Sequence, residues 1–453
     1  MSQLITGEEW RLCEGGAPYQ PDTYSSSVQT AQANIVKYRQ REVTIRLTQA
    51  GKPLAHQTFA IEQVRNAFPF GEQTWGMERA ISDTGPFSER VGYMQKRHEE
   101  LFNAANCLCY WTENTHCDGS KTEDLLGMPR LDGFYHTVNW AAAAGLYVKG
   151  HPLFWSVTKA LPKWLMRYDL ETQWKFIEVR VRQLIAGTRG KVNCWDICNE
   201  AIWEPVMANA AKRHWPHMED LNLWADDIAR LLRIARSEDP DACYVVNDYG
   251  TEEDMTENTY CKLPDGTFVS AGMQRKRMLE LFAKLGERNA LPDGLGIQSH
   301  SAWQPHDRQM AMYDQYASAG VPLQVTEFWA HSDHLAKKGM PEDEIKHWVT
   351  SYVRDTLICA YGHPAVGAFF CWGIKAVNFT DTTAHRATYV YDLLNDLLNK
   401  QWKTRTTVTT DAEGVARFRG FFGTYGVRRT QQPIQGRRFE VQPGTDGVTL
   451  VNF

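Results

Sequence analysis

The sequence lacks the features that mark several classes of protein. It has no run of about 18 apolar residues, which argues against a membrane-spanning helix. It has no basic block, and its formal net charge is −5, so no nucleic-acid partner is expected, because phosphate neutralisation needs clustered cations. The first ten residues, MSQLITGEEW, lack the charged and apolar regions of a secretory signal. We therefore expect a cytoplasmic protein, or a secreted one that has been trimmed.

The cysteines do not have the spacing of a disulfide framework or of a usual zinc site. Most of the 10 cysteines lie in apolar runs, which is typical of buried thiols in a reducing compartment. A zinc site is a weaker interpretation than buried thiols for one cluster, formed by Cys107, Cys109, His116 and Cys117. Structural zinc sites usually contain a Cys-x-x-Cys pair, which this cluster lacks. We predict that the protein binds no metal.

The central part of the chain has the pattern of repeated βα units. At 453 residues the chain is long enough for a large barrel and a smaller part. Between about Phe68 and Lys400, short apolar runs alternate with segments of helical period. Eight strands are predicted, at residues 67–71, 101–111, 146–155, 192–200, 243–249, 295–300, 322–328 and 366–373. The predicted fold class is α/β, with a (β/α)8 barrel over residues 67–400.

The two flanks of this barrel, residues 1–66 and 401–453, have the alternating pattern of β-strands. Val43, Ile45 and Leu47 alternate with polar residues before the turn AGKPL. Short alternating runs near the C-terminus are separated by Gly, Pro and Asp-Gly. We predict that the two ends of the chain pair into a small accessory β module.

Polar residues follow the predicted strands at the end where a (β/α)8 barrel has its active site. Carboxylates can act as acids, bases or nucleophiles, amides and imidazoles bind hydroxyls, and indoles stack on sugar rings. Such a composition predicts a carbohydrate ligand. The strand-end residues, in chain order, are His151, Trp155, Asn199, Glu200, Asn247, Asp248, Gln298, His300, Glu327 and Trp372.

Glu200 and Glu327 together predict hydrolysis of a glycosidic bond by double displacement. Retaining enzymes hold two carboxyl groups about 5 to 5.5 Å apart, and the fourth and seventh strands of a barrel can face each other across its mouth. In such a pair the ionised nucleophile raises the pKa of its neighbour, which then donates the proton. Consecutive residues of a strand point to opposite faces. Asn199 and Glu200 can therefore reach one ligand only if the strand end is distorted, and we predict a distortion there.

At these residues the sequence resembles glycoside hydrolase family 10, the retaining β-1,4-xylanase family built on a (β/α)8 barrel. WDICNEA is similar to the family's acid/base motif, which implies that Glu200 is the acid/base and that Asn199 binds the sugar 2-hydroxyl. VTEF is similar to the nucleophile segment and implies that Glu327 is the nucleophile. GHPLFW resembles the family's GHxLxW stretch and implies subsite roles for His151 and Trp155.

Further motifs follow in the same order along the chain. IQSH places His300 where the family's histidine holds the nucleophile, NDY matches at residues 247–249, and Trp372 lies in a similar CWG context. The resemblance extends from about Phe68 to Lys400, and the ordered set is more specific than any single motif. It implies degradation of β-1,4-linked polysaccharide, most simply xylan or xylo-oligosaccharides.

The sequence departs from the family on the second strand. Family members usually carry ENxxKW there, whose Glu, Asn and Lys bind glycone sugars, whereas this chain has NCLCYW, with Asn106, Cys107 and Tyr110 at those positions. Ser156 stands where a histidine often follows GHxLxW. These changes concern sugar recognition and leave the hydrolytic residues intact. We therefore expect Asn106 and Tyr110, with Gln298, to contribute to substrate binding.

Several alternatives stay open at this point. The same residues could act on another β-glycan or a decorated oligosaccharide, or the barrel could bind carbohydrate without turnover. A metal-dependent sugar isomerase is a third alternative on the same barrel. Glu204 is expected to be a loop residue and Asp196 a buried hydrogen-bond partner. The predicted hydrolysis needs no cofactor, and the oligomeric state and endo or exo action are left open.

Overall fold

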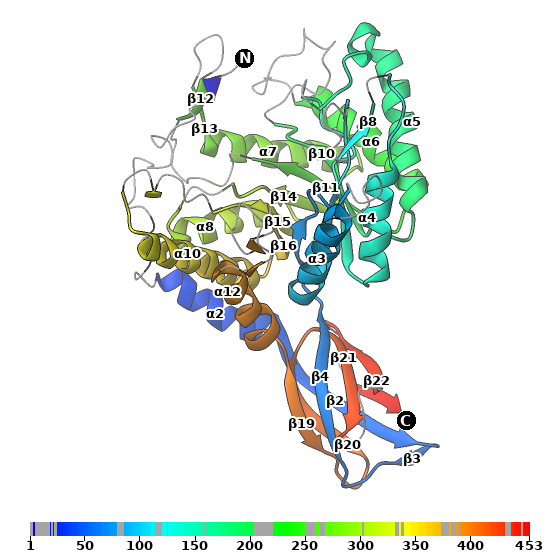
Figure 1. The fold of residues 1–453 in the computed structure, drawn as a ribbon, viewed down its shortest axis with the longest axis vertical. Coiled ribbons are helices and arrows are strands. Elements are labelled where there is room, and N and C mark those ends of the chain that lie inside the picture. Colours follow the sequence, from blue (N-terminus) through cyan, green and yellow to red (C-terminus); the bar gives the residue numbers. More distant parts are fainter. Residues whose placement is uncertain are drawn as a thin grey trace.

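The computed structural model has at its centre a closed barrel of eight parallel strands (Figure 1). The described residues are 3–4, 19, 21, 25–78, 86–113, 120–124, 126–157, 160–202, 221–249, 259–262, 268–300, 303–330, 335–336, 339–372, 380–381, 386–387, 389–430, 436–444 and 447–453. Each of the eight predicted runs overlaps one barrel strand. The barrel strands are β5 (Phe70–Gln73), β6 (Ala104–Leu108), β9 (Tyr147–His151), β10 (Cys194–Asn199), β11 (Cys243–Asp248), β14 (Gly294–Ile297), β15 (Leu323–Phe328) and β16 (Val366–Cys371).

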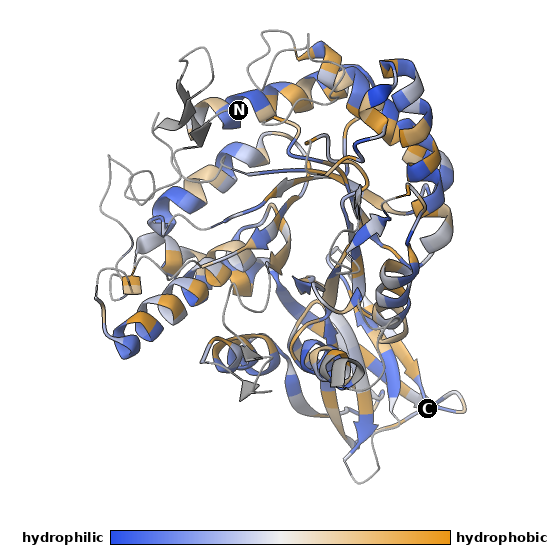
Figure 2. Ribbon diagram, turned by 45° about the horizontal axis from the view of Figure 1, so that its top comes forward, coloured by the Kyte–Doolittle hydropathy of each residue, from blue (hydrophilic) through white to orange (hydrophobic). Residues whose placement is uncertain are grey.

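Helices cover the outside of the barrel and bury their apolar faces against it (Figure 2). Trp174, Ile177 and Val181 of one helix are buried, as the helical spacing predicts. Asp169 caps that helix, because its carboxylate accepts a hydrogen bond of 2.8 Å from the amide of Thr172. The barrel helices are α3 (Pro86–Leu101), α4 (Asp132–Ala143), α5 (Leu170–Thr188), α6 (Asn222–Glu238), α7 (Ala271–Glu287), α8 (His306–Ala317), α10 (Glu342–Gly362) and α12 (Tyr389–Asp396), with the short turns η2 (Leu165–Arg167) and η4 (Leu397–Gln401).

The two ends of the chain pair into a module of two β-sheets that lies beyond one end of the barrel (Figure 1). One sheet has the order β19 (Arg405–Thr409), β4 (Thr58–Asn66), β21 (Gly423–Arg429), β22 (Arg437–Val441). The other has β2 (Gln40–Gln49) between β20 (Val415–Phe421) and β23 (Val448–Asn452), with β3 (Lys52–Pro53) also on β2. Side chains from both sheets, among them Ile45, Phe59 and Tyr425, form a core of their own. The accessory β module predicted from the flanks is thus present.

A helix that the sequence did not indicate, α2 (Ser26–Tyr38), connects the module to the barrel. Its buried residues Val28, Ala31 and Ile35 belong to the core of the barrel and not to that of the module. It packs so closely that a Cβ on Gly362 would lie 2.2 Å from the carbonyl oxygen of Ala31. The N-terminal 66 residues therefore contribute to both cores, and the predicted boundaries at 67 and 400 stay a prediction.

Short strands lie outside these two units. β7 (Tyr110–Glu113) pairs with β8 (Lys121–Glu123), and β17 (Thr380–Asp381) pairs with β18 (Arg386–Ala387). After the fifth barrel strand, β12 (Thr259–Lys262) pairs with both β13 (Phe268–Ser270) and β1 (Gln3–Leu4). Within the described ranges, every helix is too short or too polar to cross a membrane.

Candidate active site

Glu200 follows a distorted strand end. The pairing of β10 with β11 shifts register between Asp196 and Cys198, which marks a bulge. Glu200 itself has a φ of +57°, a left-handed conformation that costs a non-glycine residue on the order of 1–3 kcal/mol and that clusters at functional sites. The predicted distortion is confirmed. As a result Asn199 and Glu200 lie on the same side, since Nε2 of Gln298 is 3.3 Å from an oxygen of each.

The Glu200 carboxyl group is buried, with only 8% of the residue exposed. Its Oε2 accepts a hydrogen bond of 2.7 Å from the indole N–H of Trp155, and its Oε1 accepts the longer bond of 3.3 Å from Gln298. A backbone bond of 2.7 Å from the Glu200 amide to the carbonyl oxygen of Asn247 fixes the turn. The side chain is therefore held by neutral donors on both of its oxygens.

Glu327 occupies the end of β15 and is almost completely buried. Its Oε1 accepts a hydrogen bond of 2.7 Å from Nδ2 of Asn247, and its Oε2 lies 3.1 Å from Nε2 of His300. Nε2 of His151 is 3.9 Å from Oε1 of the same carboxylate. Glu327 is thus oriented from both sides, with two imidazoles close to its carboxylate.

Three amide side chains connect the glutamates through hydrogen bonds. Nδ2 of Asn247 donates to Oδ1 of Asn199 at 2.8 Å as well as to Glu327. The hydroxyl of Thr326 donates to Oδ1 of Asn247 at 2.6 Å, which fixes the orientation of that amide. Gln298 completes the path from Asn199 to Glu200. The two carboxyl groups predicted to meet at the mouth of the barrel therefore share one network. Asn247, one of the strand-end residues, is central to it, although the sequence predicted no role for this residue.

A buried charge network supports His151 from inside the barrel. Oδ2 of Asp196 lies 2.8 Å from Nδ1 of His151, and Oδ1 lies 2.7 Å from Nζ of Lys149. Burial alone would raise the pKa of Asp196, but Lys149 and His151 hold it below its ordinary value. Asp196 is a buried partner, as predicted. Lys149 was missed, although a lysine within the apolar run LYVKGHPLFW is itself a signal of a buried ion pair.

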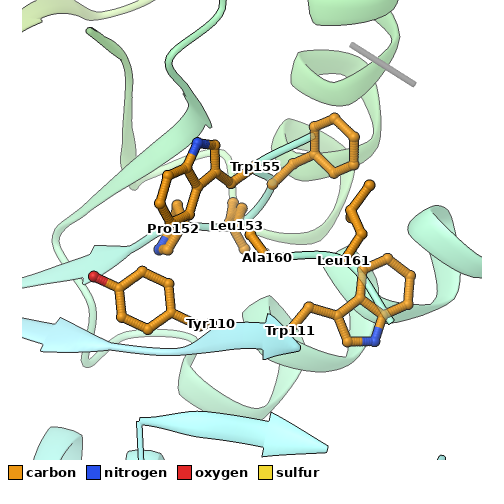
Figure 3. A pocket seen from close by; sticks show the side chains of 8 residues that line it. Tyr110, Trp111, Pro152, Leu153, Trp155, Ala160 and Leu161 are labelled. Carbon is orange, nitrogen blue, oxygen red and sulfur yellow. The ribbon is translucent and has the colours of Figure 1, made fainter. Parts of the chain in front are cut away.

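Aromatic side chains line the same site. The Tyr110 ring is 5.7 Å from His151 and 5.8 Å from Trp155, and the Trp372 ring is 5.4 Å from His151 and 6.1 Å from His300. Figure 3 shows Tyr110 facing Trp155 beside a cavity of about 10 Å³, enough for about one water molecule. Burial, together with Glu327 and Glu200, raises the pKa of Tyr110 well above its ordinary value. The phenol therefore keeps its proton and can donate it in a hydrogen bond.

Other predicted residues lie apart from this network. Asn106 is fully buried on β6, between Gln73 and Lys149 of the neighbouring strands, and its amide has no hydrogen-bond partner within the described ranges. Its substrate-binding role stays a prediction. Trp303, another tryptophan after a barrel strand, stacks on Tyr352 in the core, with 4.6 Å between the rings.

The zinc interpretation gains no support from the thiols. Cys107 and Cys109 are both buried. Burial raises the pKa of Cys109 to about 12, although the nearby Arg180 acts to lower it. A metal-binding cysteine must lose its proton, which this environment opposes. Across the residues with described positions, no group of three or more His, Cys, Asp or Glu is arranged to hold a metal. His116, Cys117 and Glu204 lie outside the described residues.

Comparison with known proteins agrees with this arrangement. The family model for glycosyl hydrolase family 10 matches residues 120–396, which is more than half of the chain. The chain belongs to glycoside hydrolase family 10. The match to the family begins after β6 and β7, where NCLCYW departs from the family's usual ENxxKW.

Relatives in this family are distant and longer. Endo-1,4-beta-xylanase 1 of Arabidopsis thaliana is 22% identical over 86% of this chain and 36% of its own length. Anti-sigma-I factor RsgI6 of Acetivibrio thermocellus is 22% identical over 91% of this chain and 48% of its own length. The chain thus spans less than half the length of these two relatives.

Solved structures share the fold. A family 10 protein from Paenibacillus barcinonensis superposes with a TM-score of 0.54 at 20% identity, covering 74% of this chain and 96% of its own. Xylanase 10B from Thermotoga petrophila, solved in complex with xylobiose, has a TM-score of 0.53 at 17% identity, with 74% and 95% of the two chains covered. At such identities the likeness establishes the (β/α)8 fold of this family 10 member.

Proposed function

We propose that the protein is a retaining glycoside hydrolase that cleaves β-1,4-linked glycans, with xylan and xylo-oligosaccharides as the first substrates to test. The observation that carries this proposal is the single hydrogen-bonded network that joins Glu200 to Glu327. Family membership and relatives named as xylanases support it. The proposed partner is a carbohydrate, and we propose no nucleic-acid or membrane partner.

In the first step Glu327 attacks the anomeric carbon while Glu200 protonates the departing glycosidic oxygen. Asn247 and His300 orient the Glu327 carboxylate for this attack. Oε2 of Glu200 is engaged by the short bond from Trp155, so Oε1, with its longer 3.3 Å contact, is the oxygen suited to carry the proton. The products are a glycosyl ester on Glu327 and a shortened glycan.

In the second step water breaks this ester. Glu200, now a carboxylate, removes a proton from the water, whose oxygen attacks the anomeric carbon and releases Glu327. Oδ1 of Asn199 already accepts hydrogen bonds from Asn247 and Gln298, so its NH2 group is the part that can donate to the sugar 2-hydroxyl. Two displacements at one carbon give net retention.

The test is turnover on a panel of β-linked polysaccharides and nitrophenyl glycosides, with the products followed by NMR. The proposal predicts reducing sugar whose first-formed anomer has the β configuration. Release of the α anomer first would reject the retaining mechanism. Cleavage of another β-glycan in preference to xylan would keep the mechanism and replace the substrate.

A barrel that binds carbohydrate without turnover is the second candidate. The relative named as an anti-sigma-I factor matches 91% of this chain, so catalysis does not follow from the match alone. A reducing-sugar assay at high protein concentration separates the two candidates, because only a hydrolase accumulates product. We also propose a cytoplasmic location, on the basis of the buried free thiols.

A further inference from the structure

A second pocket lies where the accessory β module meets the barrel. It is lined by Arg65 and Asn66 at the end of β4, by residues near the starts of β5 and β6, and by the segment around Trp402 and Lys403. In Figure 1 this junction lies between α3 and α12 above and the module strands below. Glu200 and Glu327 follow the opposite ends of the barrel strands. The pocket is therefore separate from the candidate active site.

Two half-buried cations face this pocket from the module side. Arg65 and Lys403 line it, and neither side chain forms a hydrogen bond or an ion pair with any residue within the described ranges. Burial lowers the pKa of Arg65, which Glu440 offsets in part. Burial, with Arg405 close by, lowers the pKa of Lys403, which Glu62 offsets in part. Both shifts mean that the charged forms are poorly solvated where they stand.

The acidic residues on the barrel side do not compensate these cations. Glu100 is engaged by Arg97 at 2.5 Å and by the hydroxyl of Tyr391 at 3.2 Å. Glu99 accepts a hydrogen bond of 2.6 Å from the indole of Trp140. Within the described ranges, neither carboxylate is paired with Arg65 or Lys403.

The amides around the pocket are likewise occupied by structural bonds. Asn66 bonds to Tyr361 and Trp402, and Asn103 bonds to the backbone of β5 and to the segment before it. The free hydrogen-bonding capacity of the pocket therefore belongs to Arg65 and Lys403, and it calls for an anion.

The size and lining of the pocket further limit the chemical class of ligand that fits it. Its volume is about 190 Å³, and a cavity of about 150 Å³ already holds a six-membered ring. Phe70 and Trp402 line it and stack on each other, with 5.7 Å between their rings. We propose that this pocket binds a carboxylated six-membered ring, with the carboxylate between Arg65 and Lys403. A uronic acid, free or as a glycan side group, has this chemistry.

The pocket itself does not depend on the catalytic proposal, but the choice of a sugar acid as ligand rests on it. Isothermal titration of the full chain with D-glucuronate tests the site, with D-xylose and inorganic phosphate as comparison ligands. We expect saturable binding of one glucuronate per chain and no comparable binding of the other two. Equal binding of phosphate would overturn the ring as part of the ligand, and equal binding of xylose would overturn the carboxylate.

The variants Arg65→Gln and Lys403→Gln remove the cations singly and together. Losing one charge-assisted bond costs about 1.5 to 3 kcal/mol, so each variant should weaken binding about tenfold or more. Arg417→Gln, on the exposed face of β20, is the matched control and should leave affinity unchanged. Unchanged affinity in the double variant, with a native melting temperature, would reject the site.

A further arm separates this inference from the proposed function. Glu327→Gln should lose turnover and still bind glucuronate with wild-type affinity. Binding without hydrolase activity in the wild type would reject the function and keep the pocket. Hydrolysis of the glycan without glucuronate binding would reject the pocket and keep the proposed function. A uronic-acid-substituted oligosaccharide, tested beside the free acid, shows which source of the carboxylate the pocket accepts.

Discussion

The indole N–H of Trp155 donates a 2.7 Å hydrogen bond to Oε2 of Glu200. This contact gives Trp155 a role in positioning the proposed proton donor, in addition to any stacking on sugar. Trp155→Phe keeps an aromatic face but removes the donor. Since a hydrogen bond to a charged group is worth about 1.5 to 3 kcal/mol, kcat should fall about ten- to a hundredfold.

The kinetic constants distinguish this role from simple stacking. If Trp155 acts by holding Glu200, the phenylalanine variant loses kcat with little change in KM. An equal rise in KM with unchanged kcat would instead assign Trp155 to substrate binding alone. Trp303→Phe, in the core beside Tyr352, serves as the control and should change neither constant.

Removal of either proposed catalytic carboxylate should abolish most of the activity. We expect Glu327→Ala and Glu200→Ala each to reduce turnover on an unactivated glycan by several orders of magnitude. The first variant removes the nucleophile and the second removes the acid/base. Azide should restore activity to Glu200→Ala with retained configuration. The exposed Glu171 on α5 provides the control variant Glu171→Ala. Near-normal rates in either active-site variant contradict the assignment.

The buried pair of Lys149 and Asp196 should matter to stability as well as to the site. Asp196→Asn leaves the Lys149 ammonium without its carboxylate, and breaking a buried pair costs about 3 to 5 kcal/mol. The double variant Lys149→Met, Asp196→Asn removes both charges and should recover part of that loss. Urea unfolding of the wild type, of Asp196→Asn and Lys149→Met singly, and of the double variant gives the four free energies of the cycle. Strictly additive losses would show that the 2.7 Å contact carries no coupling.

Stability should also depend on pH through Glu78, which is buried and accepts hydrogen bonds from Thr74 and Gly76. Burial raises the pKa of Glu78 from 4.5 to about 7. Between these values the folded state binds more protons than the unfolded state, so this contribution to stability is complete below the lower value and is lost as the pH rises to the upper one.

Glu78→Gln removes this dependence. Between about pH 5 and about pH 8, the free energy of unfolding of the wild type should fall relative to the variant by on the order of 3 kcal/mol. The slope of the free energy of unfolding against pH is the readout. Its absolute value is not, because the glutamine side chain has one acceptor fewer and the variant protein is therefore less stable at low pH. Glu89→Gln, at an exposed position of α3, should keep the wild-type slope. Parallel curves for wild type and Glu78→Gln would contradict the prediction.

The barrel was predictable because its signals are local. Each strand appears as a short apolar run, and each helix as a repeat of apolar residues every three to four positions. The position of Glu200 and Glu327 just at the ends of such runs also predicted that they would meet, since all strand ends of a parallel barrel share one rim. The need for a bulge at Asn199 followed from strand geometry alone.

Other features depend on which distant segments become neighbours. The sequence gives no sign that Asn247 would join Asn199 to Glu327, because those contacts span 48 and 80 residues. The packing of α2 on α10, which is distant from it in sequence, and the cation-lined pocket at the module junction also depend on tertiary structure. Residue type and periodicity thus determined the strands, the rim and its chemistry. Only the tertiary structure decided the partners of each side chain, because hydrogen bonds and charge pairs form between atoms close in space, whatever their separation along the chain.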